Sequence, residues 1–432
     1  MAGVTNQAIT KVASRRTRCR LCDGNDLVLV LPIKPSPIAD AFVGPEKKDQ
    51  PQPLIPLDLY QCQSCGHVQN LDVVNPELLF RDYIFHTSSS AGLVEHFRRY
   101  ADDVVREFQP AGGSVVVEIG SNDGTLLRFF REKGLRVLGV DPAREIAANA
   151  TAAGIPTIPD FFTSKLAQSV EQQHGRAKLI VANNVYAHAD QLGDLTDGIR
   201  SLLDDDGVFI FEVSYLLDII DKFLFDTVYH EHLSYHSIEP FTRFFRAHGL
   251  HLFDVQRIAT KGGSFRGFVQ RANGPQSERP VIRAMIDEEK RQGLHHPEIF
   301  RDYERRILDR KAAVLKFVEE ARREGKSVAG YGASTTVTTL MYHFELTDKL
   351  GFLIDDNQSK HGLFSPGCHL EVKPSSVLYE SPPDVVLVLA WQYANPITSK
   401  HSRYVEAGGQ FAVPLPELKV IGTGKRESAR IS

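Results

Sequence analysis

The sequence predicts an α/β protein in which a small cysteine-containing module precedes two α/β domains. A strand-forming run, a glycine loop and an apolar segment at helical spacing follow one another twice, beginning at Val115 and at Ser327. Two CxxC pairs stand before both units. Because 432 residues exceed what one hydrophobic core supports, we expect residues 1–80, 81–273 and 274–432 to form separate domains.

Composition and charge are those of an ordinary soluble globular protein. The apolar fraction is 42%, and 50 basic against 54 acidic residues give a net charge of −4, which indicates neither nucleic-acid nor membrane binding. No run of 18 apolar residues predicts a membrane span, and residues 1–20 lack the apolar core of a signal peptide. We therefore expect a cytoplasmic enzyme without nucleic-acid or membrane partners, either a monomer or a homodimer.

The cysteine pairs predict a metal site. Each CxxC turn can place two thiolates on one ion, and two turns complete a tetrahedral zinc site. All four positions would then be filled by protein, so the zinc should be structural rather than catalytic. Disulfides are the alternative, which the missing secretory signal disfavours. The predicted ligands are Cys19, Cys22, Cys62 and Cys65.

The glycine loop at residues 118–124, E-x-G-x-N-D-G, predicts a nucleoside-binding site. Glycines allow close approach to a ligand, and the acid that ends the next strand, Asp141, can hold both ribose hydroxyls. Two acids in the loop would repel a pyrophosphate, whereas S-adenosylmethionine carries a sulfonium cation and no phosphate. An ordinary β-turn-α unit is the alternative. The predicted cofactor residues here are Glu118, Gly120, Asn122, Asp123, Gly124 and Asp141.

Two further strands add polar groups at their carboxyl ends, where open α/β sheets bind ligands. The run at residues 155–162 ends in Asp160 and Phe161, an acid for the adenine amino group and a ring for stacking. The strand beginning at Lys178 ends at Asn183, and His188 follows it. We expect all four side chains to face the crevice, beside a further strand at residues 207–213.

Residues 229–236, Tyr-His-Glu-His-Leu-Ser-Tyr-His, hold the densest reactive chemistry of the chain. An imidazole titrates near neutrality, so this run favours acid–base catalysis with a tyrosine or carboxylate as partner. A metal site is one alternative, although HEH lacks the HExxH spacing. A polar network that holds a lid is the other.

Two shorter segments are candidate substrate contacts. Ser88 lies before a helix expected at residues 91–108, where it either caps the helix or binds a ligand. The turn at residues 261–266 offers backbone amides and cations for a phosphate, with a plain hairpin turn as the equal alternative. The candidate phosphate residues are Lys261, Gly263, Ser264 and Arg266.

The second half predicts a spacer and another α/β domain. Residues 283–323 form a charged helical stretch, expected to be a solvated linker helix between domains. Strands are expected at residues 327–331, 350–357, 385–390 and 410–414. The second glycine loop lacks acids and so could face a diphosphate, with Tyr331 and Ser334 as candidate contacts, although GxGxS alone is a weak signal.

Six motifs in one order, CxxC…CxxC, EIGSNDG, NVYAH, YHEH, GGSFR and GYGAS, resemble those of sugar C-methyltransferases that make branched deoxysugars. That family has an N-terminal zinc module, a central class I methyltransferase domain of Rossmann-like fold and a C-terminal second Rossmann-like domain. The resemblance covers nearly the whole chain. It implies S-adenosylmethionine and a structural zinc ion as cofactors.

The resemblance also implies a reaction and its residues. The substrates would be nucleotide-diphosphate-linked 4-keto-deoxyhexoses, deprotonated to an enolate and methylated at C3 by in-line transfer. His232 would be the base with Tyr229 beside it, and Glu231 would hold the sugar or the base. His188 and Tyr83 would line the same pocket.

Two other classes stay open at this stage. A nucleotide-sugar oxidoreductase or epimerase would bind a dinucleotide at the C-terminal glycine loop, which lacks the third glycine of that fingerprint. A noncatalytic zinc-containing binding scaffold would not need His232.

Overall fold

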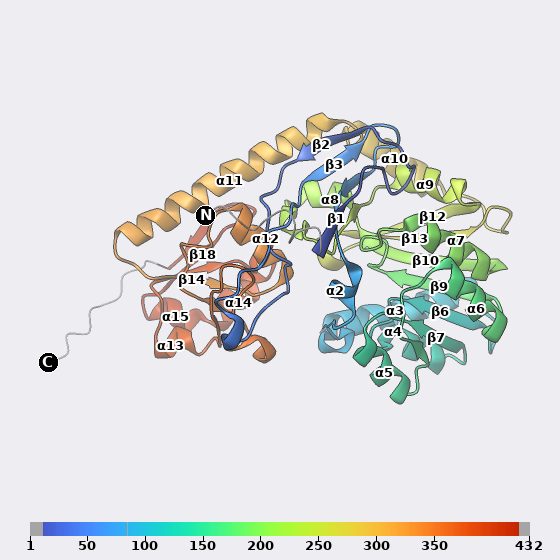
Figure 1. Ribbon diagram of the computed structural model, residues 1–432, viewed down its shortest axis with the longest axis horizontal. Coiled ribbons are helices and arrows are strands. Elements are labelled where there is room, and N and C mark those ends of the chain that lie inside the picture. Colours follow the sequence, from blue (N-terminus) through green and yellow to red (C-terminus); the bar gives the residue numbers. More distant parts are fainter. Residues whose placement is uncertain (1–11, 84, 423–432) are drawn as a thin grey trace.

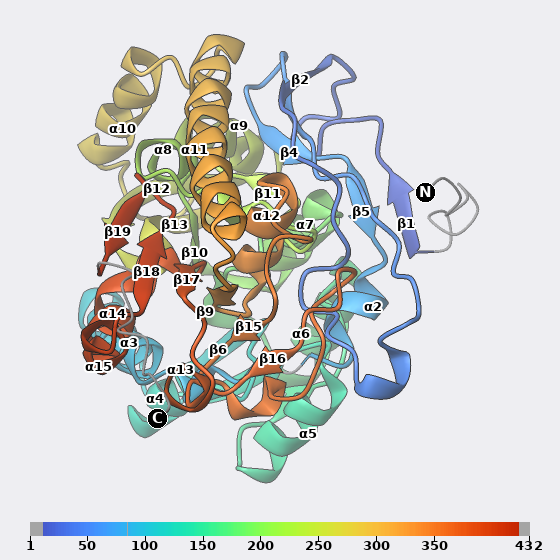
Figure 2. The same cartoon turned by 90° about the vertical axis from the view of Figure 1, so that its left-hand side faces the viewer.

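The structure is a computed structural model that describes residues 12–83 and 85–422. Figure 1 shows two α/β bodies side by side, with the N-terminal strands above and between them and one long helix running over the C-terminal body to the N-terminal strands. Figure 2 shows the C-terminal body and the long helix facing the viewer. The mixed α/β architecture is therefore confirmed.

The central body is built on a seven-stranded sheet in which five neighbouring strands, from β10 to β8 in spatial order, run parallel. The strand β13 runs antiparallel to both of its neighbours. In spatial order the strands are β12 (Leu250–Ile258), β13 (Ser264–Arg271), β10 (Leu203–Ser214), β9 (Ala177–Asn183), β6 (Val115–Ile119), β7 (Arg136–Val140) and β8 (Thr157–Ile158). The carboxyl ends of the parallel strands therefore share one edge, as expected. The strand predicted at residues 155–162 is shorter, at two residues.

Helices cover both faces of this sheet, and β6 is buried throughout because α4 packs against it. The predicted helix at residues 91–108 is confirmed. The helices of this body are α3 (Ala91–Phe108), α4 (Thr125–Glu132), α5 (Arg144–Ala152), α6 (Ser164–His174), α7 (Leu192–Leu202), α8 (Leu216–Asp221) and α9 (Ile238–Ala247).

The N-terminal strands form a small sheet that a strand from the central region completes. Its spatial order is β11 (Ser234–Tyr235), β4 (Val68–Asn70), β3 (Leu59–Cys62) and β2 (Leu27–Leu31), all antiparallel. A separate ladder joins β1 (Ala13–Arg15) to β5 (Asp72–Val74). Because β11 directly follows the Tyr-His-Glu-His run, the cysteine-containing sheet supports that run.

The C-terminal body has a six-stranded sheet, parallel except for its last strand. Its spatial order is β16 (Val372–Lys373), β15 (Leu353–Ile354), β14 (Val328–Tyr331), β17 (Val385–Val388), β18 (Gln410–Val413) and β19 (Lys419–Ile421). Its helices are α12 (Thr335–His343), α13 (Val377–Glu380), α14 (Ala394–Lys400) and α15 (Ser402–Glu406). All four strands expected here are present.

The predicted solvated linker helix is wrong in two respects. The stretch consists of two helices, α10 (Pro280–Arg291) and α11 (Pro297–Arg323), because Gly293 has a positive φ of 71° and Pro297 starts a new helix. One face of α11 is buried rather than solvated, and α11 packs against β2 and β14. The long helix therefore ties the N-terminal sheet to the C-terminal body (Figure 1).

The remaining elements are short. They are α2 (Pro76–Phe80) and the 3-10 turns η1 (Pro45–Lys47), η2 (Thr87–Ser89), η3 (Phe225–Thr227), η4 (Thr260–Gly262), η5 (Gln358–Lys360) and η6 (Trp391–Tyr393). Within the described residues, none of the helices has the length and apolar character needed to cross a bilayer.

Candidate active site and zinc site

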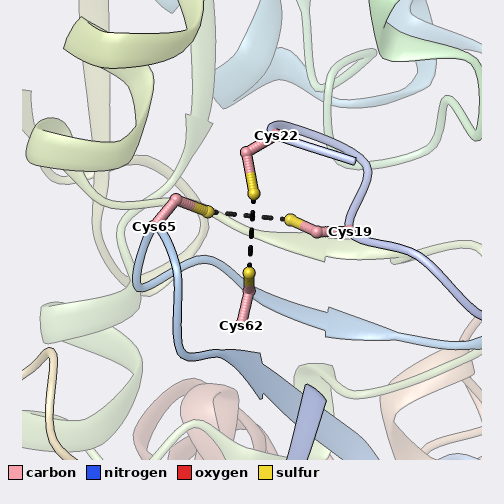
Figure 3. Close-up of side chains that lie close together, drawn as sticks. All are labelled: Cys19, Cys22, Cys62 and Cys65. Atoms are coloured by element: carbon pink, nitrogen blue, oxygen red, sulfur yellow. Dashed lines mark hydrogen bonds between the residues drawn. The ribbon is translucent and has the colours of Figure 1, made fainter. Parts of the chain in front are cut away.

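The four cysteines converge on one point, as Figure 3 shows. Their Sγ atoms all lie within 4.8 Å of one another, with 3.6 Å between Cys19 and Cys65 and 3.5 Å between Cys22 and Cys62. Tetrahedral zinc–thiolate bonds of about 2.3 Å place sulfurs roughly 3.8 Å apart, so the cluster fits zinc. The separations far exceed a disulfide bond of about 2.05 Å, which excludes the disulfide alternative.

The first glycine loop has the backbone that its sequence predicts. Gly120 and Gly124 have φ values of 69° and 73°, in the left-handed region. A Cβ on Gly120 would lie 2.6 Å from the Val185 side chain, and one on Gly124 would lie 2.9 Å from Ile155. Both positions therefore require glycine.

Buried polar atoms without partners gather at the carboxyl ends of β6 and β9. They are Glu118 Oε2, Ser121 Oγ, both amide atoms of Asn183 and His188 Nε2. These ends are neighbours because β6 and β9 pair in parallel. Burial, with the charge of Asp141 second, raises the pKa of Glu118 well above its ordinary value. Buried polar groups are normally satisfied, so this edge fits a polar ligand.

Asp141 is buried directly after β7, so the predicted position of an acid at the end of this strand is confirmed, and its ribose contact stays a prediction. One carboxylate oxygen accepts from the Asn122 backbone N–H at 2.7 Å and the other from Ala143 at 2.9 Å. Each oxygen keeps a lone pair for a further donor. The backbone contacts hold the carboxylate beside the loop.

The side chains of Asn122 and Asp123 hold a neighbouring segment rather than an open ligand position. Asn122 accepts from the Thr87 N–H at 2.9 Å and donates to Phe85 O at 2.8 Å. Asp123 accepts from the Ser88 N–H at 2.9 Å and from Thr125 at the start of α4. The segment at residues 85–89 therefore covers the glycine loop. Ser88 itself is exposed, and the helix cap of α3 is Ser90.

Arg81 contacts both Asp160 and Phe161, the two residues from which we expect adenine contacts. Arg81 donates to Asp160 Oδ1 at 3.1 Å, and its guanidinium lies 4.7 Å from the centre of the Phe161 ring. Asp160 is mostly exposed. Arg81, which ends α2, thus occupies the face of Phe161 that we assigned to adenine.

His232 is fixed at both ring nitrogens. Nδ1 lies 2.8 Å from Thr227 O, a carbonyl that can only accept, so Nδ1 carries the proton. Nε2 is then the unprotonated nitrogen and accepts from the Tyr229 hydroxyl at 2.9 Å. The lone pair that a general base requires is therefore on Nε2, where the Tyr229 hydroxyl occupies it and must move before Nε2 can accept another proton.

The surroundings keep His232 and His188 neutral. Burial, followed by the charge of Lys261, lowers the pKa of His232 to about 3. Burial and the nearby His232 lower the pKa of His188 well below its ordinary value. The two rings lie 5.2 Å apart, and His188 stacks on Phe80 at 5.6 Å.

Glu231 and Tyr83 belong to the same neighbourhood. Glu231 is 8% exposed, and burial, with the charge of Asp40 second, raises its pKa to about 7. Burial also raises the pKa of Tyr83, and the charges of Glu231, Asp40 and Asp141 add to this effect. Phe80 lies 6.1 Å from Tyr83 and also contacts His188. Tyr83 therefore sits between the cofactor edge and the histidine run.

The other two histidines of the run have structural partners. His230 Nε2 lies 3.2 Å from Ile55 O, and His236 Nε2 lies 3.0 Å from Tyr186 O. His236 also stacks on Phe241 at 4.1 Å. The polar-network alternative thus describes these two residues, while His232 faces Tyr229 and His188.

The segment at residues 261–266 forms the hairpin between β12 and β13, as its structural alternative predicted. Lys261 lies at its apex with φ 52°, an uncommon conformation for a residue with a Cβ. Lys261 keeps solvent contact, yet surrounding protein lowers the pKa of its ammonium, which the charges of Glu231 and Glu212 oppose.

The other three residues predicted to bind phosphate are occupied by contacts within the protein. Arg266 is 5% exposed and forms a buried ion pair with Glu212 at 2.6 Å, beneath the Tyr100 ring. Ser264 is buried and donates to Thr260 O, and Asp218 fills the space beside Gly263. We therefore withdraw Arg266, Ser264 and Gly263 as phosphate contacts and retain Lys261.

The C-terminal body reaches the site through α12. Burial raises the pKa of Tyr229, and the nearby Thr335 opposes this rise. Thr339 Oγ1 donates to Val228 O at 2.6 Å. Ser334 is exposed at the start of this helix. Tyr331 is buried, with its hydroxyl 3.0 Å from Asp356 and 3.0 Å from His401, so it belongs to the C-terminal core rather than to a substrate contact.

Residues that the sequence analysis missed join the three parts of the chain. Asp40 pairs with Lys360 at 2.7 Å, and Lys360 also donates to Ala333 O in the second glycine loop. Asp226 accepts from the Trp391 indole at 2.8 Å. The Asp40–Lys360 and Asp226–Trp391 contacts each cross more than 150 residues of sequence, and neither carries a local motif.

Comparisons with known proteins agree with this architecture. Family models match in order: a zinc-binding domain at residues 19–80, a methyltransferase domain at residues 93–255 and a C-methyltransferase C-terminal domain at residues 259–416. The fold, the loop and the cysteine cluster define an S-adenosylmethionine-dependent methyltransferase with a structural zinc site. The chain is 34% identical to the C-methyltransferase NovU of Streptomyces niveus over 404 residues, spanning 93% of this chain and 96% of NovU. The chain belongs to the C-methyltransferase family.

Solved structures resemble the chain only in part. A magnesium protoporphyrin IX methyltransferase from Synechocystis PCC 6803 has a TM-score of 0.32 and 15% identity, over 41% of this chain and 81% of that chain. The CcbJ methyltransferase from Streptomyces caelestis has a TM-score of 0.33 and 15% identity, over 41% of this chain and 89% of that chain.

Proposed function

We propose that this enzyme methylates C3 of a nucleotide-diphosphate-linked 4-keto-deoxyhexose, with His232 as the base. The observation that carries the proposal is the oriented, unprotonated Nε2 of His232, held by Thr227 O on one side and Tyr229 on the other. A carbon acid beside a carbonyl needs a neutral base and a site that stabilises the enolate. Family membership supports carbon as the atom that is methylated.

As the substrate enters, the Tyr229 hydroxyl releases the Nε2 lone pair that it occupies in the free enzyme. The proton then moves from C3 to Nε2, and the C3–H electron pair becomes the enolate. His232 is neutral at pH 7 because its pKa is about 3, so it is ready to accept. The imidazolium and the enolate form together as a pair, which offsets the cost of charging a buried ring. Lys261, the cation of this neighbourhood, stabilises the negative charge on the C4 oxygen.

The neighbouring groups hold the substrate. Glu231, with a pKa of about 7, accepts or donates a hydrogen bond to the sugar or the base. His188 and Tyr83 line the same pocket between the cofactor edge and His232. When bound, S-adenosylmethionine supplies the electrophilic methyl group, and the edge formed by Glu118, Asn183 and Asp141 holds it.

The C-terminal body contributes the nucleotide contacts in this proposal. Thr335, the first residue of α12, interacts with Tyr229, and the exposed Ser334 precedes it in the chain. In our proposal the diphosphate attached to the sugar extends to Ser334 and to the first backbone N–H groups of α12. The expected divisions at residues 1–80, 81–273 and 274–432 give each part a role: zinc support, cofactor and base, and nucleotide. Thiolate zinc ligands suit a reducing cytoplasm.

The test is product analysis with isotopically labelled S-adenosylmethionine. Wild-type enzyme is incubated with nucleoside-diphosphate-linked 4-keto-deoxyhexoses, and the labelled carbon is located by NMR. We expect a new carbon–carbon bond at C3 with wild type and none with His232→Asn, while His232→Asn still binds S-adenosylhomocysteine. C5 also flanks the carbonyl, so a label there would overturn the position, and a label on oxygen would overturn the reaction.

A further inference from the structure

The carbonyl that orients His232 belongs to a short segment, residues 225–228, between α8 and the Tyr-His-Glu-His run. Thr227 O accepts from His232 Nδ1 at 2.8 Å. Any shift of this carbonyl turns the imidazole and redirects Nε2. The placement of the segment therefore decides where the base points.

The C-terminal body holds this segment on both sides of Thr227. Before it, the Trp391 indole N–H donates to Asp226 Oδ2 at 2.8 Å. After it, the Thr339 hydroxyl donates to Val228 O at 2.6 Å. The ring of Phe225 stacks on Phe344 with centroids 5.3 Å apart. Both hydrogen bonds reach the segment from the second α/β body, through η6 and α12.

Asp226 is an unusual residue for a purely structural contact. It is 1% exposed, and its Oδ1 has no hydrogen-bond partner among the described residues. Burying a carboxyl group that accepts from only one side-chain donor costs free energy of folding. A pair of apolar residues would stabilise the interface without that cost. Such exceptions call for a functional reason. A hydrogen bond fixes the orientation of the 225–228 segment, whereas an apolar contact does not.

We propose that Asp226, Trp391 and Thr339 are positioning residues through which the C-terminal body aims His232 at the substrate. The base is then competent only while η6 and α12 hold the 225–228 segment. Substrate bound to the C-terminal body and proton removal in the central body are thereby coupled. This inference rests on the proposed role of His232.

The test compares Trp391→Phe and Thr339→Val with wild type, using S-adenosylmethionine and the 4-keto-deoxyhexose nucleotide that wild type methylates. We expect kcat to fall roughly tenfold to a hundredfold in each, as for a misplaced reacting group, with S-adenosylhomocysteine affinity unchanged. Thr339→Ser keeps the hydroxyl and should restore kcat. Tyr404→Phe is the matched control, because it removes a hydrogen bond of the C-terminal core to Pro383 that does not touch the segment.

Asp226 gives a second test with its own spectroscopic signal. Trp391 is the only tryptophan of the chain, so indole emission reports this contact directly. Asp226→Asn keeps an acceptor oxygen and should retain both the emission maximum and kcat, whereas Asp226→Ala should shift the emission and lower kcat.

Opposite results would overturn the inference. Wild-type kcat in Trp391→Phe and Thr339→Val, or an equal loss in Tyr404→Phe, would show that the contact does not position the base. His232→Asn is measured in the same assay to separate the two claims. Retained turnover in His232→Asn would refute the proposed function, whereas its loss together with unaffected positioning variants would refute only this inference.

Discussion

His232 shows how two backbone and side-chain partners decide the protonation state of a single ring. Thr227 O takes the Nδ1 proton, so the lone pair falls on Nε2, where Tyr229 already donates. Burial raises the pKa of the Tyr229 hydroxyl well above its ordinary value, so Tyr229 stays a protonated phenol at pH 7 and cannot take the C3 proton directly. Tyr229 is therefore an orienting partner in our account.

Replacing Tyr229 with phenylalanine tests this division of roles. The ring contact with His232 is kept and only the hydroxyl is lost. We expect kcat to fall by roughly tenfold because the imidazole loses an orienting hydrogen bond. Steady-state kinetics beside His232→Asn provides the measurement. Inactivity as complete as in His232→Asn would mean that Tyr229 relays the proton.

At the scale of elements, the turn between β6 and α4 fits its ligand through backbone shape. Gly120 combines a left-handed φ with a neighbour so close that a methyl group cannot be accommodated. The carboxyl ends of β6, β7 and β9 then lie at one edge, where Glu118 and Asn183 keep unpartnered atoms. The helix α12 of the second body approaches the 225–228 segment instead.

The Gly120→Ala variant should bind S-adenosylhomocysteine at least tenfold more weakly. The left-handed φ of 69° costs a residue with a Cβ roughly 1–2 kcal/mol, and Val185 must also move. Titration calorimetry measures the affinity. Adding Val185→Ala should recover part of the loss by removing the contact, and Gly112→Ala is the control because it meets nothing within 4 Å. Wild-type affinity in Gly120→Ala would refute the placement of the cofactor.

At the scale of the whole molecule, the zinc sheet connects to the catalytic run through the β4–β11 ladder. Ser234 pairs with Gln69 and Tyr235 with Val68. His67 also lies 3.2 Å from Ser234 Oγ. Loss of the metal should therefore reach His232 through the backbone, although the zinc has no role in the chemistry.

Cys62→Ser should release zinc and lower methyl transfer while leaving S-adenosylhomocysteine binding largely intact, because the cofactor edge lies in another sheet. Metal analysis and kinetics on the same preparation check both parts. Cys368→Ser, away from the cluster, serves as the control. Stoichiometric zinc in Cys62→Ser would contradict the site, and a full loss of cofactor binding would contradict the separation of the two sheets.

Buried histidines should also make stability depend on pH. Burial lowers the pKa of His230 from 6.5 to about 4, so below pH 6.5 the unfolded chain takes up a proton that the folded chain refuses. The stability contributed by His230 is therefore present above pH 6.5 and lost as pH falls towards 4. Glu231, with its pKa raised from 4.5 to about 7, acts in the opposite direction, so a variant comparison is needed.

Between pH 6 and 4.5, wild type should lose unfolding free energy faster than His230→Gln, by about 1.4 kcal/mol per pH unit. Urea unfolding at several pH values gives the slopes. The exposed His86, replaced by glutamine, is the control and should leave the slope unchanged. Equal slopes for wild type and His230→Gln would show that His230 is protonated in the folded state.

Local motifs predicted the parts of this molecule whose geometry is local. The CxxC turns and the 118–124 loop each fix their own backbone, and the structure confirms the cysteine cluster and the loop's left-handed glycines. Side chains whose partners are distant in sequence could not be assigned this way. Arg266 pairs with Glu212, and Arg81 lies over the Phe161 ring. Both contacts form only when strands and modules assemble, so the local sequence does not predict them.

The contact between α12 and Val228, directly before the Tyr-His-Glu-His run, is the clearest case of a contact that local sequence patterns do not predict. In the sequence Thr339 is one polar residue of a helix, yet its hydroxyl donates a hydrogen bond to Val228 O, 111 residues earlier in the chain. Asp226 and Trp391 likewise have no motif. The spacer predicted to be solvated consists of α10 and α11, and one face of α11 is buried because it packs against the N-terminal sheet and the C-terminal body.

Solvent deuterium exchange at the substrate carbon tests the central claim most directly. The enzyme is held with S-adenosylhomocysteine in D₂O, and a 4-keto-deoxyhexose nucleotide that the wild type methylates is followed by NMR. Without a methyl donor, no other step consumes the enolate, so it takes a deuteron from the solvent. We therefore predict that wild type exchanges the C3 hydrogen for deuterium and that His232→Asn does not. Exchange at the wild-type rate in His232→Asn would contradict the account.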